Sequence, residues 1–562
     1  MRYLLRHVVL LPFLFAIPFG STVAQHPVGD LGDELSQFGE ARIAVTVSSP
    51  AQLQQIADVS SLLGFDGDQT AWVNVNAEEL NKLVMLGYSY RHDPVPRPES
   101  EGLTATVGHL MQHWDAYPTY EGYDSMMIAF GQSHPGLCKV HEILTLNSGR
   151  KILIAQITSQ NTPPGGKPKF LYSSTMHGNE TAGYILMLRL IDYLLNGYGT
   201  DPEVTWILDN MEVWIAPLTN PDGTYFGGNH TVNQAIRRNA NNVDLNRNYP
   251  DPRVGANPDG HAYQPETMAF KALADTVSFV MGANLHSGAE VANYPWDTWI
   301  KQHPDDGWWR YVCRMYADTV QANSPPGFFT DLDNGITNGA AWYVITGGRQ
   351  DYMNYYAYCR EMTLEVSGIF IEPVHRLPLM WDYHHRALIN YLKEGWYGLR
   401  GTVTDSVTGN PLRARVTVNQ HDADSSHVWS DAHTGHYYRL LEQGTYTVLY
   451  EASGYHSASF QVSVAAGDTT IRDVQLAPIG QRVPDRVLRH LKIWYDETSQ
   501  CLRFRNLPAE PVSVKVYTVD GRLLQRDNLA SECMPVRGGT GVRMIKLMHP
   551  NGDQIVRKVF VY

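Results

Sequence analysis

Two histidines and a glutamate that could hold a metal ion stand at the ends of apolar runs. His177 and Glu180 lie three residues apart in HGNE, one residue after the strand-like run KFLYSST. His286 ends a second such run, VSFVMGANLH. A catalytic zinc ion takes three protein ligands, often His and carboxylate, and keeps one position open for water. A lone His-x-x-Glu pair is more often structural, but two strand-end sites of this kind predict a shared metal site at one edge of a sheet.

The run EMTLEVS places a carboxylate inside an otherwise apolar strand. Strand alternation puts Glu361, Thr363 and Glu365 on one face. A buried carboxylate is costly unless a cation pairs with it or it has a function. Because hydrolysis needs a general base that is not itself a metal ligand, Glu365 is the candidate base. The alternative is an ion pair between Glu365 and a core arginine.

A polar loop, AIRRNANNVDLNRNYPD, gathers guanidinium and amide donors. Arginine can hold a carboxylate through two parallel hydrogen bonds, so the loop suits an anionic group near the metal. The alternative is a solvated loop rich in Asn and Arg. The candidate residues are Arg237, Arg238, Asp244, Asn246 and Arg247.

Several kinds of domain must position these residues. Helix-like and strand-like patterns alternate over residues 104–397, which predicts an α/β/α domain with one mixed sheet and helices on both faces. Residues 25–103 alternate on a smaller scale, which predicts a small α/β plait and a Pro-rich linker. Residues 398–478 and 479–562 show short alternating strands between Gly, Asn, Pro and Asp turns, so we expect two β-sandwich domains.

Residues 1–24 have the pattern of a secretory signal peptide. Arg2 and Arg6 precede a short apolar core, and Thr22-Val23-Ala24 forms a small-residue cleavage site. No later run reaches about 18 apolar residues, so we expect no transmembrane segment in the mature chain. The net charge of −13 argues against a nucleic-acid partner.

Export permits disulfide bonds, and the chain has five cysteines. Cys313 and Cys359 are candidates for a pair in the middle domain, and Cys501 and Cys533 for a pair in the last domain. Cys138 would then be a free, buried thiol. Spacing alone does not establish any of these pairs.

Seven segments together resemble the zinc metallocarboxypeptidase family, and most of all its branch related to carboxypeptidases N, E and D. They run in family order from residue 177 to residue 367: HGNE, NPDG, RRNANNVDLNRNYPD, QPET, NLHSGAEVANYPWD, GITNGAAWY and EMTLEVS. The resemblance implies one zinc ion per catalytic domain, held by His177, Glu180 and His286. It implies Glu365 as the base that takes a proton from water and later passes it to the leaving amine.

The resemblance also implies roles for the polar loop. Arg237 best matches the arginine that polarises the scissile carbonyl, with Arg238 as the alternative. Asn246 and Arg247 match the pair that holds the terminal carboxylate of a substrate, and Tyr343 matches a mobile tyrosine that closes over it. Binding a free carboxylate at a fixed distance from the metal restricts cleavage to the last peptide bond.

Two further residues match the pocket for the last side chain of the substrate. Asp297 matches an aspartate that pairs with a C-terminal Lys or Arg in this branch, and Gln350 lies near the same pocket. Asp244 matches the carboxylate that orients a metal-binding histidine. The expected function is release of C-terminal Lys or Arg from peptides and proteins by an exported enzyme. The alternatives are a carboxypeptidase for cell-wall stem peptides and a surface binding protein without catalysis.

The flanking regions carry looser resemblances. Residues 398–478 resemble the transthyretin-like or carboxypeptidase regulatory-like domain that follows the catalytic domain in this branch. Residues 479–562, with VKVYTVDGRLL and the closing KVFVY, resemble the C-terminal sorting domain of type IX secretion cargo. The implied partner is the type IX secretion machinery, and the implied location is outside the cell or on its outer surface. By analogy with other branches, residues 25–103 would be a prodomain or a folding aid.

Overall fold

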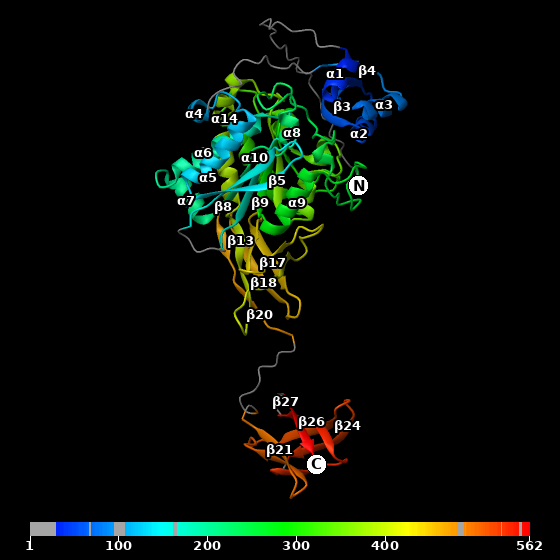
Figure 1. The fold of residues 1–562 in the computed structure, drawn as a ribbon, viewed down its shortest axis with the longest axis vertical. Coiled ribbons are helices and arrows are strands. Elements are labelled where there is room, and N and C mark those ends of the chain that lie inside the picture. Colours follow the sequence, from blue (N-terminus) through cyan, green and yellow to red (C-terminus); the bar gives the residue numbers. More distant parts are fainter. Residues whose placement is uncertain are drawn as a thin grey trace, which may run out of the picture. The chain divides into compact units, whose positions relative to one another are not determined.

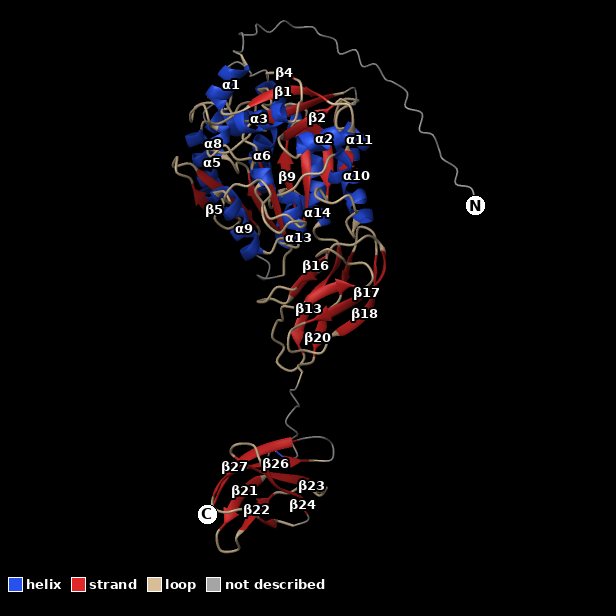
Figure 2. Ribbon diagram, turned by 90° about the vertical axis from the view of Figure 1, so that its right-hand side faces the viewer, coloured by secondary structure: helices blue, strands red, loops and turns tan. Residues whose placement is uncertain are grey.

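The computed structural model describes residues 30–66, 69–94, 107–160, 166–479, 488, 490–529, 531–549 and 554–562 (Figures 1 and 2). The signal-peptide prediction for residues 1–24 lies outside this part of the chain. The chain divides into two compact units. The first comprises Met1–Ser453 and Ser457–Leu476, and the second comprises Gly454–His456 and Ala477–Tyr562. Among the described residues, no helix is both long enough and apolar enough to span a membrane.

An eight-stranded mixed sheet forms the middle of the first unit, in the order β11-β10-β12-β9-β7-β8-β6-β5. The four central strands are parallel, whereas β6 and β10 join them antiparallel. Central parallel strands are covered on both faces, and most residues of β7, β8, β9 and β12 are accordingly buried. The strands are β5 (Cys138–Thr145), β6 (Lys151–Ile157), β7 (Lys169–Ser174), β8 (Glu212–Ala216), β9 (Met281–His286), β10 (Ala289–Tyr294), β11 (Ile336–Asn338) and β12 (Arg360–Ser367).

Helices cover both faces of this sheet, as the sequence predicted. Successive residues of β6 point into different cores: Leu153 packs with α5, α6, α10 and α14, whereas Ile154 packs with α9 and α13. Figure 1 shows α5 and α6 at one side of the strands and α9 at the other. The helices are α4 (Val107–His113), α5 (Tyr120–Ser133), α6 (Ala182–Gly197), α7 (Pro202–Asn210), α8 (Pro221–Thr224), η1 (Leu245–Arg247), α9 (Pro265–Val277), α10 (Asp306–Ala322), α11 (Asp331–Asn334), α12 (Gly339–Trp342), α13 (Arg349–Tyr355), η2 (Val374–Arg376) and α14 (Leu377–Glu394).

The expected disulfide between Cys313 and Cys359 is wrong. Cys313 on α10 belongs to the core on one face of the sheet, and Cys359 belongs to the core on the other face. A disulfide requires Cα atoms within about 7 Å, and the sheet separates these two residues. Both thiols are free and buried, and so is Cys138, as expected.

Two glycines set the corner between β7 and α6 that carries HGNE. A Cβ atom at Gly178 would lie 2.3 Å from the main-chain carbonyl carbon of Gly223. A Cβ atom at Gly183 would lie 2.3 Å from Ser174 Oγ and 2.9 Å from Leu285 Cβ. The strand end and the helix start can approach this closely only where there is no side chain.

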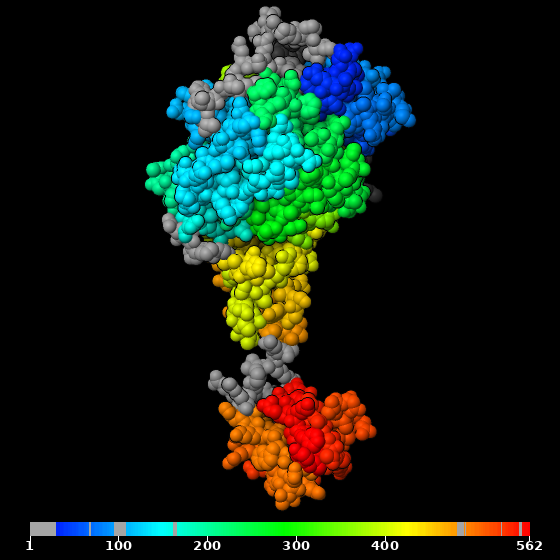
Figure 3. Space-filling model, in the orientation of Figure 1, coloured from blue at the N-terminus to red at the C-terminus, as the bar shows by residue number. Residues whose placement is uncertain are grey.

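Residues 30–92 form a smaller module of the first unit, with an antiparallel sheet in the order β2-β3-β1-β4. The apolar residues from Pro50 to Gly64 follow a helical pattern, but the helix ends at Ala57 and Ser61–Phe65 form strand β2. Pairing of β2 with β3, which local patterns do not reveal, decides this segment. Figure 3 shows the blue surface of the module against the green surface of the sheet domain. The elements are α1 (Leu31–Phe38), β1 (Ala41–Thr46), α2 (Pro50–Ala57), β2 (Ser61–Phe65), β3 (Thr70–Val75), α3 (Ala77–Met85) and β4 (Tyr90–His92).

Two β modules follow the sheet domain. The one in the first unit has two sheets, β16-β13-β19 with β20 beside β13, and β15-β14-β17-β18. Its strands are β13 (Gly398–Asp405), β14 (Arg415–Val418), β15 (Val428–Trp429), β16 (His436–Arg439), β17 (Gly444–Glu451), β18 (Ala458–Val464), β19 (Thr469–Ile471) and β20 (Val474–Leu476).

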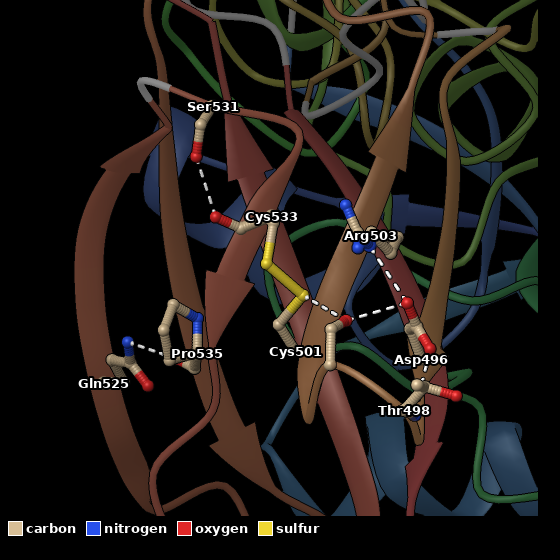
Figure 4. The surroundings of a disulfide bond; sticks show 9 residues. Asp496, Thr498, Cys501, Arg503, Gln525, Ser531, Cys533 and Pro535 are labelled. Carbon is tan, nitrogen blue, oxygen red and sulfur yellow. Dashed lines mark hydrogen bonds and ion pairs between the residues drawn. A yellow bond between two sulfur atoms is a disulfide. The ribbon is translucent and has the colours of Figure 1, made fainter.

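The second unit also has two sheets, β21-β22-β25 and β24-β23-β26-β27. The expected disulfide between Cys501 and Cys533 is confirmed and joins β22 to β25 (Figure 4). The strands are β21 (Lys492–Asp496), β22 (Cys501–Arg505), β23 (Val512–Thr518), β24 (Leu523–Leu529), β25 (Cys533–Pro535), β26 (Gly541–Met548) and β27 (Gln554–Val561).

A buried charge cluster ties the first β module to the sheet domain. Asp305 accepts from Arg360 Nε on β12 at 2.9 Å and from Arg439 Nη2 on β16 at 2.7 Å. Asp305, His421 and Asp422 have a spacing that could hold a metal ion. Because two arginines already neutralise these carboxylates, the cluster is structural rather than a metal site.

Candidate active site

His177, Glu180 and His286 converge at the carboxyl ends of β7 and β9. Glu180 places one carboxylate oxygen 2.8 Å from His177 Nδ1 and the other 2.8 Å from His286 Nδ1. The two Nδ1 atoms are 3.0 Å apart, and all three side chains are buried. Donor atoms this close together, on two histidines and one carboxylate, fit a single metal ion.

Hydrogen bonds on the far side of each imidazole hold the two rings. Asp244 Oδ1 lies 2.9 Å from His177 Nε2, and the Asn284 amide lies 2.6 Å from His286 Nε2. Such partners fix the ring orientation and leave each Nδ1 for the metal. Asp244 was expected here, but Asn284 was missed. Its position in β9, two residues before His286 and on the same face, was the signal that could have identified it.

Glu365 lies beside His286, because the register of β12 and β9 pairs these two residues. Its Oε2 is buried and has no hydrogen-bond partner among the described residues. Burial raises the pKa of Glu365 well above its usual range, and the charge of Glu180 adds to the shift. The core arginine that was the alternative partner instead binds Glu361, where Arg349 makes two contacts of 3.0 Å.

The two adjacent arginines of the polar loop point in different directions. Arg237 donates to Glu180 Oε1 at 3.0 Å and to Asp244 Oδ2 at 3.1 Å, inside the metal site. Arg238 points into the N-terminal module, where three acceptors surround it: Glu40, Asn74 and Glu79. Of the two, only Arg237 lies where it could donate to a substrate carbonyl oxygen.

Asn246, Arg247 and Tyr343 line the same cavity as the metal-site residues. The Nη2 atom of Arg247 is buried and has no partner in the described part of the chain. The Asn246 side-chain oxygen accepts the Arg349 main-chain N–H at 2.9 Å, which fixes this side chain in the cavity wall. Arg247 therefore has a donor free for a substrate carboxylate, close to the metal site.

Asp297 is buried in the cavity wall. Its Oδ1 accepts from Gln350 Nε2 at 2.9 Å and from Asn293 Nδ2 at 3.4 Å. No Lys or Arg of the described residues forms an ion pair with it, and burial raises the pKa of Asp297 to about 7. Gln350 contacts Asp297 from behind the cavity wall, and Asn293 is an additional wall residue that the sequence did not indicate.

The N-terminal module reaches into this cavity, which the sequence patterns did not predict. Ser61 Oγ donates to Asp244 Oδ2 at 2.7 Å, and the Tyr343 hydroxyl donates to the Leu62 carbonyl at 3.2 Å. Leu62 and Leu63 line the cavity. The remaining volume is about 40 Å³, which corresponds to a few water molecules. The module thus covers the site in this conformation.

Comparisons with known proteins agree with this geometry. Residues 123–386 match the zinc carboxypeptidase family, and residues 398–477 match the carboxypeptidase regulatory-like domain. Mouse carboxypeptidase M is 34% identical over 365 residues, which cover 61% of this chain and 79% of that protein. Carboxypeptidase E from Caenorhabditis elegans is 30% identical over 413 residues, which cover 65% of this chain and 86% of that protein. Human carboxypeptidase D is 34% identical over 354 residues, so the chain spans 25% of that longer relative.

The mixed sheet and the convergent ligands at its strand ends define a metallopeptidase of the α/β/α type. The chain belongs to the zinc carboxypeptidase family, and its His177, Glu180 and His286 donors fit the zinc ion that this family uses. A domain of the carboxypeptidase regulatory-like type follows the metallocarboxypeptidase domain.

Proposed function

We propose that this protein is a zinc-dependent carboxypeptidase that releases single residues, preferably Lys or Arg, from the C-termini of peptides and proteins. The buried, unpartnered oxygen of Glu365 beside His177, Glu180 and His286 carries the proposal. A carboxylate that forms no ion pair among the described residues and lies next to a metal site is available to take a proton. Mouse carboxypeptidase M, which this chain matches over 79% of that protein's length, is named as a carboxypeptidase.

Four polar residues of the cavity have tasks in this reaction. Zinc, when bound, supplies a Lewis acid for the scissile carbonyl and for the attacking water. Arg247, with Asn246 beside it, binds the terminal carboxylate and so selects the last peptide bond. Arg237 donates to the carbonyl oxygen as negative charge develops there. Glu365 takes the proton of the attacking water and passes it to the leaving amine.

The preference for Lys or Arg rests on Asp297. This buried carboxylate lines the cavity and has only amide donors as partners among the described residues. A cationic side chain of the substrate would supply the missing positive charge, whereas an apolar side chain would leave the carboxylate buried and uncompensated. Asp297→Lys should therefore abolish release of basic residues.

The test is release of the last residue from matched peptides that end in Lys, Arg, Leu or Phe. The zinc-loaded protein should release Lys and Arg, and a chelator or Glu365→Gln should stop the reaction. Release of Leu or Phe in preference to Lys would retain the peptidase and reject the role of Asp297. Zinc binding without release from any peptide would reject the peptidase proposal.

The geometry favours neither of the two alternative functions, a cell-wall carboxypeptidase and a binding protein. A cell-wall stem-peptide carboxypeptidase would have no use for a buried acidic side chain at Asp297. A binding protein without catalysis would have no need to keep Glu365 unpaired beside three convergent ligands. Incubation with purified peptidoglycan fragments and with basic peptides in parallel separates these functions.

We also propose that residues 25–103 act as a prodomain that restrains the enzyme. The contacts of Ser61 with Asp244 and of Leu62 with Tyr343 support this, because both reach residues assigned to catalysis or substrate binding. Cleavage of the chain between residues 94 and 107 should then raise the activity on Lys-terminated peptides. Unchanged activity after complete cleavage and separation would leave the module a folding aid.

For export we propose a signal peptide at residues 1–24 and a type IX sorting domain at residues 479–562, with a secreted or outer-surface product. The support is sequence resemblance, together with a separate, all-β second unit that carries a disulfide. The transthyretin-like character of residues 398–478 rests on the same kind of resemblance. In a host with type IX secretion, a protein without residues 479–562 should stay in the periplasm, because it could not cross the outer membrane. Normal export of this shortened protein would contradict the proposal.

A further inference from the structure

Asp351, at the start of α13, is a buried acidic residue next to the proposed pocket for basic side chains. Its carboxylate accepts the main-chain N–H of Asp297 at 3.0 and 3.2 Å and that of Thr298 at 2.8 Å. The side chain is 1% exposed, and no Lys or Arg of the described chain pairs with it. Asp351 therefore holds the backbone of the residue that the specificity proposal depends on.

The wall around Asp297 is built closely on its other sides as well. A Cβ atom at Gly339 would lie 1.8 Å from Asp297 Oδ1, so only glycine fits there. Gln350 donates to the same oxygen and accepts the Thr363 N–H at 2.8 Å, which links Asp297 to β12. Asn293 is 8% exposed, lines the cavity, and has a side-chain oxygen without a partner among the described residues. A buried acceptor without a partner in this wall indicates that a hydrogen-bond donor of a bound ligand pairs with it.

The presence of a carboxyl group at Asp351 needs an explanation beyond hydrogen bonding, because burial and the neighbouring Asp297 raise the pKa of Asp351 well above its usual range. A neutral Asn could accept the same two N–H groups through one oxygen, since Asp351 Oδ2 already lies within 3.2 Å of both nitrogens. Two adjacent buried carboxylates without a cation cost free energy that two neutral side chains would not. The arrangement is favourable once a cation enters the pocket beside them.

We infer that Asp351 is a positioning residue for basic substrates, which fixes the Asp297 backbone and adds a second negative charge to the pocket. This rests on the proposed release of C-terminal Lys or Arg. Other charged or titratable groups that face the pair are Asp251, Arg247 and Tyr343. Arg247 is committed to the terminal carboxylate in the proposed mechanism, so a basic side chain would be the cation that compensates both aspartates.

Asp351→Asn removes the carboxylate charge but keeps an oxygen that can accept the two main-chain hydrogen bonds. We expect kcat/KM for a Lys-terminated peptide to fall about tenfold, mainly through KM, because one negative charge near the ammonium group is lost in a partly buried site. The matched Leu-terminated peptide should change less than twofold. The acid limb of the kcat/KM profile for the Lys peptide should also move to lower pH, since Asp297 would lose its acidic neighbour. Asp318→Asn, an exposed change on α10, is the matched control and should leave all values unchanged.

The outcomes distinguish the inference from the function on which it rests. If wild-type protein shows no preference for Lys or Arg, the specificity proposal fails and this inference fails with it. If wild-type protein prefers Lys but Asp351→Asn leaves the Lys-to-Leu ratio and the pH profile unchanged, only the role of Asp351 is overturned. An equal loss for both peptides would also overturn it, because Asp351 would then support the fold alone. Asp351→Ala, which removes the acceptors too, should lower the thermal midpoint as well as the ratio.

Discussion

Replacing Glu40 with alanine tests whether the N-terminal module restrains the site. Glu40 is 3% exposed and accepts the main-chain N–H groups of Arg237 at 2.7 Å and Arg238 at 3.2 Å. It also pairs with the Arg238 guanidinium at 3.3 Å. Glu40→Ala removes a charge-assisted hydrogen-bond acceptor while Glu79 still pairs with Arg238, so the change should cost about 1.5–3 kcal/mol. Undocking lets water solvate the groups that Glu40 leaves unpaired, so the ratio of undocked to docked module should rise on the order of 10- to 10²-fold.

The assay is the initial rate of release from a short Lys-terminated peptide by the zinc-loaded full chain. Glu40→Ala should raise kcat/KM, because substrate binds only where Leu62 and Leu63 have left the cavity. Glu78→Ala is the control, since Glu78 is exposed and pairs with Lys82 on the outer side of the module. Hydrogen exchange of Ser61–Phe65 reports undocking independently. Faster exchange without a higher rate would refute the reasoning, because the module would then leave the site without releasing activity.

Three further results follow from the site and the second unit. Glu365→Gln should lower kcat by about 10²- to 10⁴-fold while one zinc ion per chain remains by elemental analysis, and loss of zinc would mean that Glu365 is a ligand instead. Between about pH 8 and pH 6, kcat/KM for a Lys-terminated peptide should fall as pH falls, because burial raises the pKa of Asp297 to about 7 and only its ionised form attracts a cation. Parallel profiles for Lys and Leu peptides would contradict this. Reducing the bond between Cys501 and Cys533, 32 residues apart, should destabilise the second unit by about 3–4 kcal/mol, seen as one calorimetric transition that moves down while the others stay.

The main elements of the sheet domain could be predicted because their signals are local. The strand-like runs KFLYSST and VSFVMGANLH contain β7 and β9, and α6 is an apolar stretch of helical length. The small module was predicted less well, because Leu62 and Leu63 fit a helical stripe and a strand equally well. Pairing with β3 made the segment a strand, and that contact joins residues that local periodicity does not connect.

For the polar loop and the cysteines, the sequence could not predict the directions in which the side chains point. Arg237 and Arg238 are neighbours of the same type, and only the packing of Glu40 against the loop shows which of them faces the metal site. Cys313 and Cys359 were plausible partners by spacing, but they lie in cores on opposite faces of the sheet. The direction of the arginines and the pairing of the cysteines both depend on distances in the folded protein, and the spacing of residues in the sequence does not give these distances.

By itself, the sequence determined the chemistry of this protein: two histidines and a glutamate at strand ends, a carboxylate inside an apolar strand, and an arginine-rich loop. These signals can be recognised in the sequence because a strand end, a helix start and an alternating strand are each determined by residues that are neighbours in the chain. Only the tertiary structure decided that Glu365 is free while Glu361 is paired, that Asp351 holds Asp297, and that β2 covers the cavity. Each of these depends on contacts between segments far apart in the chain, which form only when the domains pack.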